Sequence, residues 1–135
     1  MKRLLITGSR KWDDRDTIRD ALYMAFLQMG GQGGEKITLV HGGAPGADKI
    51  AAEIWSRNSG MPIEAHRAMW EIWGKAAGRN RNLVMVQRGA DLCLAFHKDG
   101  SPGTAHCIAA AEEAGIPVRI FKEVSKLGQD GDGNG

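Results

Sequence analysis

Five short apolar runs, separated by longer segments of helical periodicity, constrain the fold of this chain more than any other feature. The runs comprise residues 3–7, 37–41, 62–66, 92–96 and 117–121. Short runs that are apolar almost throughout are typical of parallel strands that helices cover on both faces. The segments at 14–29, 46–58, 79–88 and 103–114 repeat apolar residues every three to four positions, as amphipathic helices do. This alternation predicts a three-layer α/β domain with a parallel sheet of about five strands flanked by helices.

The length and composition fit one small globular domain. The chain has 135 residues, of which 42% are hydrophobic and 25% charged, so a coiled coil or a wholly disordered chain is excluded. The apolar pattern predicts a single domain over residues 1–124. Residues 125–135 are rich in Gly and Asp and have Leu127 as their one apolar residue, so we predict a disordered tail there.

Nothing in the sequence predicts a membrane segment or an export signal. No apolar run approaches the roughly 20 residues that span a bilayer. The segment Met1–Gly8 is too short for the apolar core of a signal peptide and lacks a small-residue cleavage site. Two cysteines, Cys93 and Cys107, are too few for a disulfide framework. We therefore expect a cytoplasmic protein without a membrane partner.

The charge is nearly balanced overall but uneven along the chain. Eighteen basic and sixteen acidic residues give a formal net charge of +2, which by itself does not indicate nucleic-acid binding. The segment from Arg67 to Arg88 contains a single acidic residue, Glu71. Its five basic residues are Arg67, Lys75, Arg79, Arg81 and Arg88. Arg79 and Arg81 lie near a predicted helix start, where the helix dipole disfavours cations, so they favour a bound anion there. The segment is predicted to form an anion-attracting patch.

Glycine-rich turns follow the first, second and fourth apolar runs, at the edge where open parallel sheets bind ligands. Backbone N–H groups at a helix start are unpaired, and the helix dipole there favours anions. Glycine lets the backbone approach a phosphate closely, and hydroxyl or basic side chains add donors. Three such turns at one edge predict a phosphate-bearing ligand. The candidate ligand-binding residues are Gly8, Ser9, Arg10, Trp12, Gly42, Gly43, Asp48, Arg79, Arg81, Asn82, Ser101, Gly103 and Thr104.

Two of these candidates have a second interpretation. Trp12 either stacks on a base of the ligand or packs in the core, as tryptophan more often does. Asp48 either accepts hydrogen bonds at the start of its own helix or acts in catalysis. Both alternatives remain open for each residue on the sequence alone.

The standard nucleotide and metal motifs are absent from the sequence. There is no Gly-x-x-x-x-Gly-Lys-Ser/Thr, Gly-x-Gly-x-x-Gly or Gly-x-Ser-x-Gly, which argues against a P-loop ATPase, a standard dinucleotide dehydrogenase and an α/β-hydrolase. The four histidines are scattered, and no Cys-x-x-Cys or His-x-x-x-His pair occurs, so no metal site is predicted from side chains. A magnesium ion accompanying a bound phosphate remains an alternative.

Several segments, taken together, resemble a known family. They are Thr7-Gly8-Ser9-Arg10-x-Trp12-x-Asp14, Val40-His41-Gly42-Gly43-Ala44-x-Gly46-Ala47-Asp48, Gly74-Lys75-Ala76-Ala77-Gly78-x-x-Arg81-Asn82, Ser101-x-Gly103-Thr104 and Ala114-Gly115-Ile116-Pro117-Val118. Their order and spacing resemble the YspA-type, cpYpsA-related branch of the SLOG superfamily, common in bacteria and their phages, over the chain up to Phe121. The resemblance implies a Rossmann-like fold that binds a nucleoside monophosphate or an ADP-ribose-like or NAD-like molecule.

The resemblance implies three alternative functions. The first is a domain that senses or processes such a ligand. The second is hydrolysis of the N-glycosidic bond of nucleoside monophosphates, as in the related LOG phosphoribohydrolases, with Arg81 and Asp48 as catalytic candidates. Those hydrolases carry a catalytic Glu where this chain has Cys107, which cannot act as a carboxylate. The third is single-stranded DNA binding, as in the DprA proteins. Trp70 and Trp73 exceed what so small a core needs and suggest a homodimer.

Overall fold

The computed structural model describes residues 1–123, in which strands and helices alternate along the chain. The strands are β1 (Lys2–Gly8), β2 (Ile37–His41), β3 (Ile63–Ala65), β4 (Leu92–Lys98) and β5 (Val118–Glu123). The α-helices are α1 (Arg15–Gln28), α2 (Ala47–Asn58), α3 (Trp70–Trp73), α4 (Ala77–Gln87) and α5 (Pro102–Glu113). Each predicted strand and helix overlaps one of these elements. The predicted tail, residues 125–135, lies outside the described residues.

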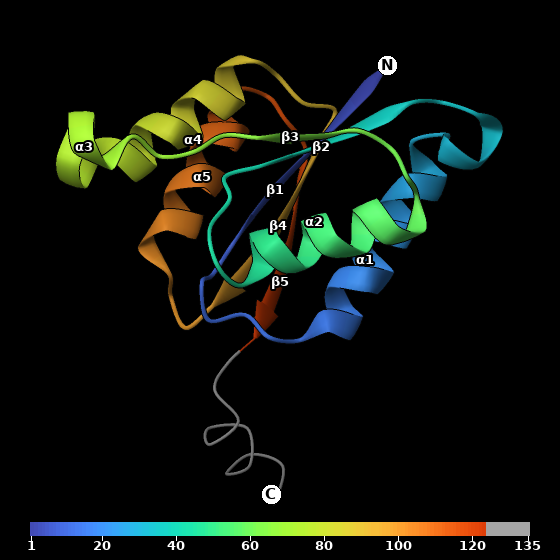
Figure 1. Ribbon diagram of the computed structural model, residues 1–135, viewed down its shortest axis with the longest axis horizontal. Coiled ribbons are helices and arrows are strands. Elements are labelled where there is room, and N and C mark those ends of the chain that lie inside the picture. The colour runs from blue at the N-terminus through green and yellow to red at the C-terminus, as the bar shows by residue number, and fades with distance from the viewer. Residues whose placement is uncertain (124–135) are drawn as a thin grey trace, which may run out of the picture.

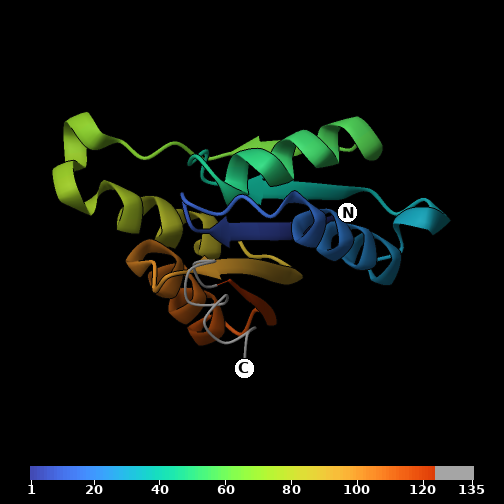
Figure 2. The same cartoon turned by 90° about the horizontal axis from the view of Figure 1, so that it is seen from below.

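The five strands form one parallel sheet in the order β3-β2-β1-β4-β5, which confirms the predicted fold class. β1 lies at the centre, where Leu4 pairs with Leu39 of β2 and with Leu92 of β4. Figure 2 shows the strands side by side, with β1 between β2 and β4. Helices α1 and α2 cover one face of the sheet, and α4 and α5 cover the other (Figure 1). The arrangement is Rossmann-like and has three layers.

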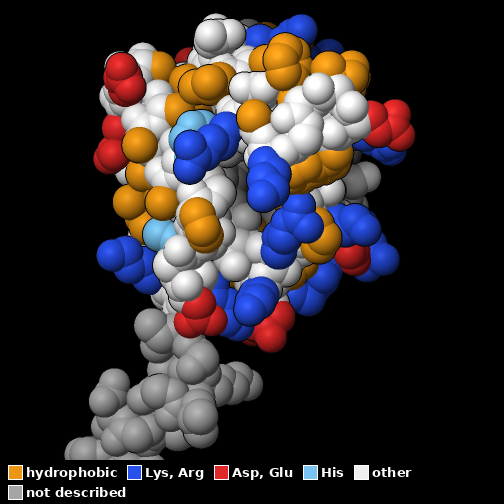
Figure 3. Space-filling view, turned by 90° about the vertical axis from the view of Figure 1, so that its left-hand side faces the viewer, with side chains coloured by type: hydrophobic (Ala, Val, Ile, Leu, Met, Phe, Trp, Pro, Cys, Tyr) orange, Lys and Arg blue, Asp and Glu red, His pale blue; other side chains and the backbone are white. Residues whose placement is uncertain are grey.

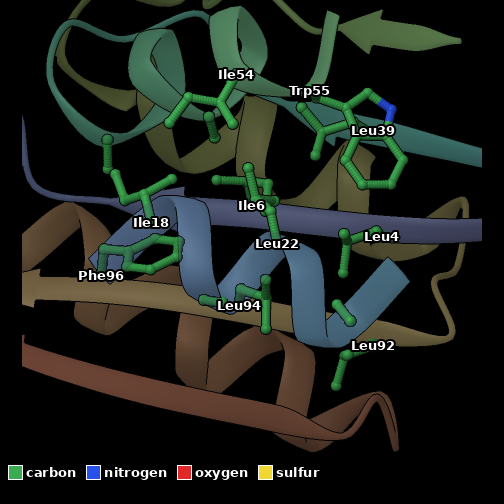
Figure 4. Packing of buried hydrophobic residues seen from close by; sticks show 14 of the residues in the cluster. Leu4, Ile6, Ile18, Leu22, Leu39, Ile54, Trp55, Leu92, Leu94 and Phe96 are labelled. Atoms are coloured by element: carbon green, nitrogen blue, oxygen red, sulfur yellow. The ribbon is translucent and has the colours of Figure 1, made fainter. Parts of the chain in front are cut away.

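The core lies on both faces of the sheet because successive side chains of a strand point in opposite directions. Leu4 and Ile6 of β1 pack with α1 and α2, whereas Leu5 packs with α4 and α5, and all three are fully buried. Figure 4 shows the first of these clusters, in which Ile18 and Leu22 of α1 meet the sheet. Each fully buried aliphatic side chain contributes about 1.5–3 kcal/mol. Side chains thus fill both faces of the sheet, which leaves the ends of the strands as the place for a ligand site.

The segment between β3 and α4 differs from the sequence-based prediction. Residues Trp70–Trp73 form the short helix α3, which was not predicted, and α4 begins at Ala77 rather than at residue 79. Gly74 has a φ of +56°, and this conformation interrupts the α-helical backbone between α3 and α4. Four residues are too few to show the apolar repeat that identifies a helix in a sequence. In Figure 2, α3 stands away from the three layers.

Candidate functional site

The predicted site residues gather at the carboxyl edge of the sheet, around a cavity of about 240 Å³. The chain passes from β1 to β2 on one side of β1, whereas β4 pairs with β1 on the other side. Open parallel sheets bind ligands at such a reversal of strand order. β1 ends at the cavity, and α2 and α5 begin beside it. Eight of the thirteen candidates line the cavity: Gly8, Arg10, Asp48, Arg81, Asn82, Ser101, Gly103 and Thr104.

The other five candidates lie outside this lining. Ser9 is buried, and its hydroxyl accepts a hydrogen bond from the N–H group of Lys11 at 3.2 Å, so it shapes the turn after β1. Gly42 is buried in the loop between β2 and α2, whereas Gly43 is exposed. Arg79 is exposed on α4. The fifth candidate, Trp12, requires a correction.

Trp12 packs in the core and is not available to stack on a base. Its side chain is 2% exposed, and its ring meets Phe96 edge-on with the ring centroids 5.4 Å apart. The indole Nε1–H donates to the carbonyl of Asp14 at 2.9 Å. The base-stacking interpretation of Trp12 is therefore wrong, because the protein itself uses both the apolar ring and the polar atom of this side chain.

Two of the predicted glycines permit close packing within the protein rather than close approach of a phosphate. A Cβ atom on Gly8 would collide with the Cβ of Ala47 at the start of α2. A Cβ atom on Gly42 would collide with the guanidinium group of Arg81. Both contacts join segments that are far apart in the sequence. The glycine pattern thus identifies the edge of the sheet where the cavity lies, but these two glycines serve packing contacts within the protein.

Asp48, in the first turn of α2, carries a buried carboxyl group. Its Oδ2 accepts hydrogen bonds from the N–H groups of Gly42 at 3.0 Å and Ala44 at 3.4 Å, so it holds the preceding loop rather than the start of its own helix. Within residues 1–123, Oδ1 has no hydrogen-bond partner. Burial raises the pKa of Asp48 to about 6, although those backbone hydrogen bonds and the charges of Arg81 and Arg10 oppose the rise.

Two arginines bring positive charge to the cavity. Arg10, in the turn after β1, is exposed, and Arg81, in α4, is half-buried. Arg81 donates from Nη1 to the carbonyl of Gly42 at 2.5 Å and from Nε to the side-chain oxygen of Asn82 at 2.9 Å. Among the described residues, no carboxylate forms an ion pair with either arginine. An anion entering the cavity would meet two guanidinium groups, which suit phosphate geometry.

The start of α5 adds backbone donors to the same cavity. Ser101 precedes the helix and Pro102 is its first residue, so Gly103 and Thr104 carry unpaired N–H groups of the first turn. That turn contains no acidic residue, which leaves the positive end of the helix dipole without a compensating charge. The buried side chain of Asn82 donates to the carbonyl of Gly103 at 3.4 Å and thereby ties α4 to α5.

Cys107, which stands where the resemblance places a catalytic Glu, belongs to the core. It is fully buried and packs in a cluster with Met85 and Ala111. Burial raises the pKa of its thiol. The cavity lining formed by residues 1–123 does not include Cys107, so this position brings no ionised group to the cavity.

A larger hollow of about 730 Å³ lies between the loop after β3 and helices α3 and α4, and we call it the α3–α4 groove. Its lining includes His66, Arg67, Trp73 and Arg81, and Arg81 also lines the cavity. Figure 3 looks onto this side of the molecule and shows Lys and Arg side chains gathered on the face, with acidic side chains at its margins. Two of the five basic residues of the predicted patch, Arg67 and Arg81, thus line the groove, and Arg81 also connects it to the cavity.

In the part of the chain that the structure describes, no group of three or more His, Cys, Asp and Glu side chains is placed to hold a metal ion. None of the helices in the same residues combines the length and apolar character needed to cross a membrane.

A parallel sheet with a cavity at its switch point, lined by two arginines and a helix start, defines a Rossmann-like domain. Within that class, the chain belongs to the YspA, cpYpsA-related SLOG family, whose model matches residues 2–73. The family resemblance seen in the sequence is thereby confirmed.

Two relatives extend the comparison beyond the family model. The chain is 50% identical over 126 residues to the Gene 61 protein of Mycobacterium phage D29, a match that covers 90% of this chain and 97% of that protein. It also resembles the X-ray structure of TM1055, with a TM-score of 0.59, 18% identity and coverage of 87% of this chain and 72% of that chain. At 18% identity, this second likeness supports the fold alone.

Proposed function

We propose that this protein binds the phosphate end of a nucleotide or nucleotide-derived ligand in the cavity and serves as a ligand-sensing or processing domain. The observation that carries the proposal is the convergence of Arg10, Arg81 and the unpaired N–H groups at the start of α5 on one cavity. Phosphate accepts hydrogen bonds at several oxygens and carries negative charge, so it matches both kinds of donor. Membership of the SLOG family supports the same class of ligand.

The size of the cavity indicates how such a ligand would lie. Its volume of about 240 Å³ is below the roughly 300–1,000 Å³ of sites that enclose a drug-sized ligand. The cavity therefore suits the phosphate and sugar, and the base extends beyond it. The α3–α4 groove shares Arg81 with the cavity, and its Trp73 is 55% exposed, so it offers a surface on which a base stacks.

Hydrolysis of an N-glycosidic bond is the second candidate function. Asp48 brings a carboxyl group to the cavity near Arg81, and its pKa of about 6 suits proton transfer close to neutral pH. Within residues 1–123, however, Asp48 is the one carboxylate of the lining, since Cys107 occupies the position of the hydrolase Glu. Binding without turnover is therefore the first proposal.

Single-stranded nucleic acid is an alternative ligand for the α3–α4 groove. Trp73 and Arg67 in its lining offer base stacking and a phosphate contact. The formal net charge of +2 supplies little general attraction to a polyanion. A small nucleotide is therefore the preferred ligand.

Isothermal titration calorimetry with AMP, ADP-ribose and NAD tests the proposal. We expect saturable binding of at least one of them, and a loss of about 10- to 100-fold in affinity for Arg10→Ala and Arg81→Ala. Each variant removes charge-assisted hydrogen bonds of about 1.5–3 kcal/mol. The matched control is Arg57→Ala, because Arg57 is exposed at the end of α2 and lies outside the cavity lining. Titrations with and without Mg²⁺ show whether the ion accompanies the phosphate.

Three other outcomes would change the assignment. Release of free base from AMP, lost in Arg81→Ala, would establish hydrolysis. Salt-sensitive binding of a DNA oligonucleotide, without binding of the nucleotides, would establish the nucleic-acid alternative. If none of the three nucleotides binds, or if both arginine variants retain full affinity, the proposed function is refuted.

A further inference from the structure

Oδ1 of Asp48 is a buried hydrogen-bond acceptor that the protein does not use. Buried polar atoms without a hydrogen-bond partner occur on four side chains within residues 1–123, namely Asp48, Trp55, His97 and Glu123, although Oε1 of Glu123 forms an ion pair with Lys98 at 3.0 Å. Of these four, Asp48 lines the cavity. A buried polar group left unpaired costs about 1–3 kcal/mol, and more when it is charged. A bound ligand that supplied a donor at this point would recover that free energy.

The surrounding contacts hold this carboxyl group in place and leave one of its oxygens unpaired. The N–H groups of Gly42 and Ala44 occupy Oδ2, so rotation of the carboxyl group would only exchange one unpaired oxygen for the other. Arg81 lies close enough to influence the pKa of Asp48, yet it donates to the carbonyl of Gly42 and to Asn82 instead. Oδ1 is therefore a buried, unpaired acceptor on a residue that lines the cavity.

The chemistry of a nucleotide determines which of its parts fits this acceptor. The ionised phosphate has acceptor oxygens and negative charge, so it belongs with Arg10, Arg81 and the start of α5 rather than with a carboxylate. The sugar is the part of a nucleotide next to the phosphate, and its hydroxyl groups are hydrogen-bond donors. The base lies farther from the phosphate, beyond a cavity of about 240 Å³.

We propose that Asp48 accepts a hydrogen bond from a sugar hydroxyl of the bound ligand and thereby discriminates against nucleotides that lack this hydroxyl. This inference rests on the proposed function, because it assigns the sugar to the same cavity as the phosphate. A site that hydrogen-bonds a hydroxyl rejects an analogue lacking it, since the buried partner is then left unpaired. Asp48 is a specificity-determining residue in this proposal, whether or not the ligand is turned over.

Calorimetric titration with AMP, 2′-deoxy-AMP and 3′-deoxy-AMP tests this proposal. We expect the wild type to bind AMP about 10- to 100-fold more tightly than at least one of the deoxy analogues. In Asp48→Asn, the loop N–H groups still require an oxygen at the Oδ2 position, so the NH₂ group takes the Oδ1 position and cannot accept. The preference for AMP should then fall to about threefold or less.

A second readout separates recognition from damage to the fold. Asp48→Asn removes a negative charge near the phosphate, so this variant should bind the rejected deoxy analogue at least as tightly as the wild type does. A merely misfolded protein would lose affinity for all three ligands. Asp16→Asn, which changes an exposed carboxylate on α1, is the matched control and should keep the wild-type preference. If Asp48→Asn does not fold, as judged by circular dichroism, equal wild-type affinity for the three nucleotides still overturns the inference.

The outcomes that overturn this inference differ from those that refute the proposed function. Equal wild-type affinity for all three nucleotides overturns the inference and leaves phosphate binding intact. An unchanged preference in Asp48→Asn also overturns it. A third result would also overturn the inference. If the wild type binds AMP more tightly than inosine monophosphate, Asp48→Asn abolishes this preference, and the deoxy analogues bind as well as AMP, then Asp48 contacts the base and not the sugar. If the wild type binds no nucleotide, both proposals fail.

Discussion

At the scale of single residues, Asp48 couples the stability of the fold to pH. Burial raises the pKa of its carboxyl group from 3.8 to about 6, so the folded state binds this proton more tightly than the unfolded state does. The unfolded state therefore releases the proton first as the pH rises. The contribution of Asp48 to stability is fully present below about pH 4 and is lost as the pH rises through about 6.

The comparison of wild type with Asp48→Asn isolates this effect. In urea denaturation from about pH 4 to pH 7, the free energy of unfolding of the wild type, relative to the variant, should fall by on the order of 3 kcal/mol. The variant lacks the titrating group but keeps an oxygen for the loop N–H groups of Gly42 and Ala44. A difference between the two proteins that stays constant over this range would contradict the prediction.

Single residues also show why the sequence predicted most of the cavity lining but not every side-chain contact around it. Arg10 and Ser101 lie in the turns after β1 and β4, and Thr104 lies in the first turn of α5, so sequence position alone predicts that they lie at the carboxyl edge. Trp12 also follows a strand end, yet its side chain turns into the core against Phe96, which the sequence could not reveal. Such contacts depend on residues that are distant in the chain.

At the scale of elements, Gly8 allows the end of β1 to pack closely against the start of α2. A Cβ atom at this position would collide with the Cβ of Ala47 and lie 3.0 Å from the carbonyl oxygen of Phe96. Neither atom belongs to a flexible side chain, so α2 or β4 would have to move.

We therefore expect Gly8→Ala to lower the free energy of unfolding by about 1–3 kcal/mol, the cost typical of overpacking. Chemical denaturation measures this loss. Gly33→Ala is the matched control, because no atom lies within 4 Å of the position that a Cβ would take there and its φ is not positive. Equal stability of the two variants would show that α2 is not packed tightly on β1.

The elements that the sequence predicts well are those with a repeating apolar face. α1 and α2 begin and end within one or two residues of their predicted limits, because apolar residues mark one side of each helix over several turns. α3 has four residues and exposed tryptophans, so no apolar face indicates it. Gly74, with its φ of +56°, ends α3, and a glycine does indicate such a break, but the four residues before it are too few to predict a helix.

At the scale of the whole molecule, exposed apolar side chains gather on and beside α3. Met69, Trp70, Ile72 and Trp73 are 52%, 52%, 65% and 55% exposed. A contiguous apolar surface of this kind marks an interaction site in a globular protein. We expect a second copy of the chain to cover Trp70 and Ile72, which lie outside the lining of the α3–α4 groove, in agreement with the homodimer suggested by the number of tryptophans.

Sedimentation velocity tests this expectation on the full chain. The wild type should sediment as a dimer, and Trp70→Ser combined with Ile72→Ser should shift it to a monomer, because these changes remove apolar area from the interface. The matched control combines Tyr23→Ser and Met24→Ser on α1, which are similarly exposed at 61% and 50% but lie away from α3. A monomeric wild type, or dissociation in the α1 variant alone, would contradict the prediction.

The contact between Gly42 and Arg81 has a consequence for how related chains diverge. The two residues are 39 positions apart, yet a side chain at position 42 would displace the guanidinium group from the carbonyl to which it donates. A lineage that keeps Arg81 in this place therefore keeps glycine at position 42, and a lineage that loses Arg81 is released from that requirement. We therefore expect a side chain at position 42 only in chains that have lost Arg81, whereas loss of Arg81 alone remains compatible with glycine at position 42.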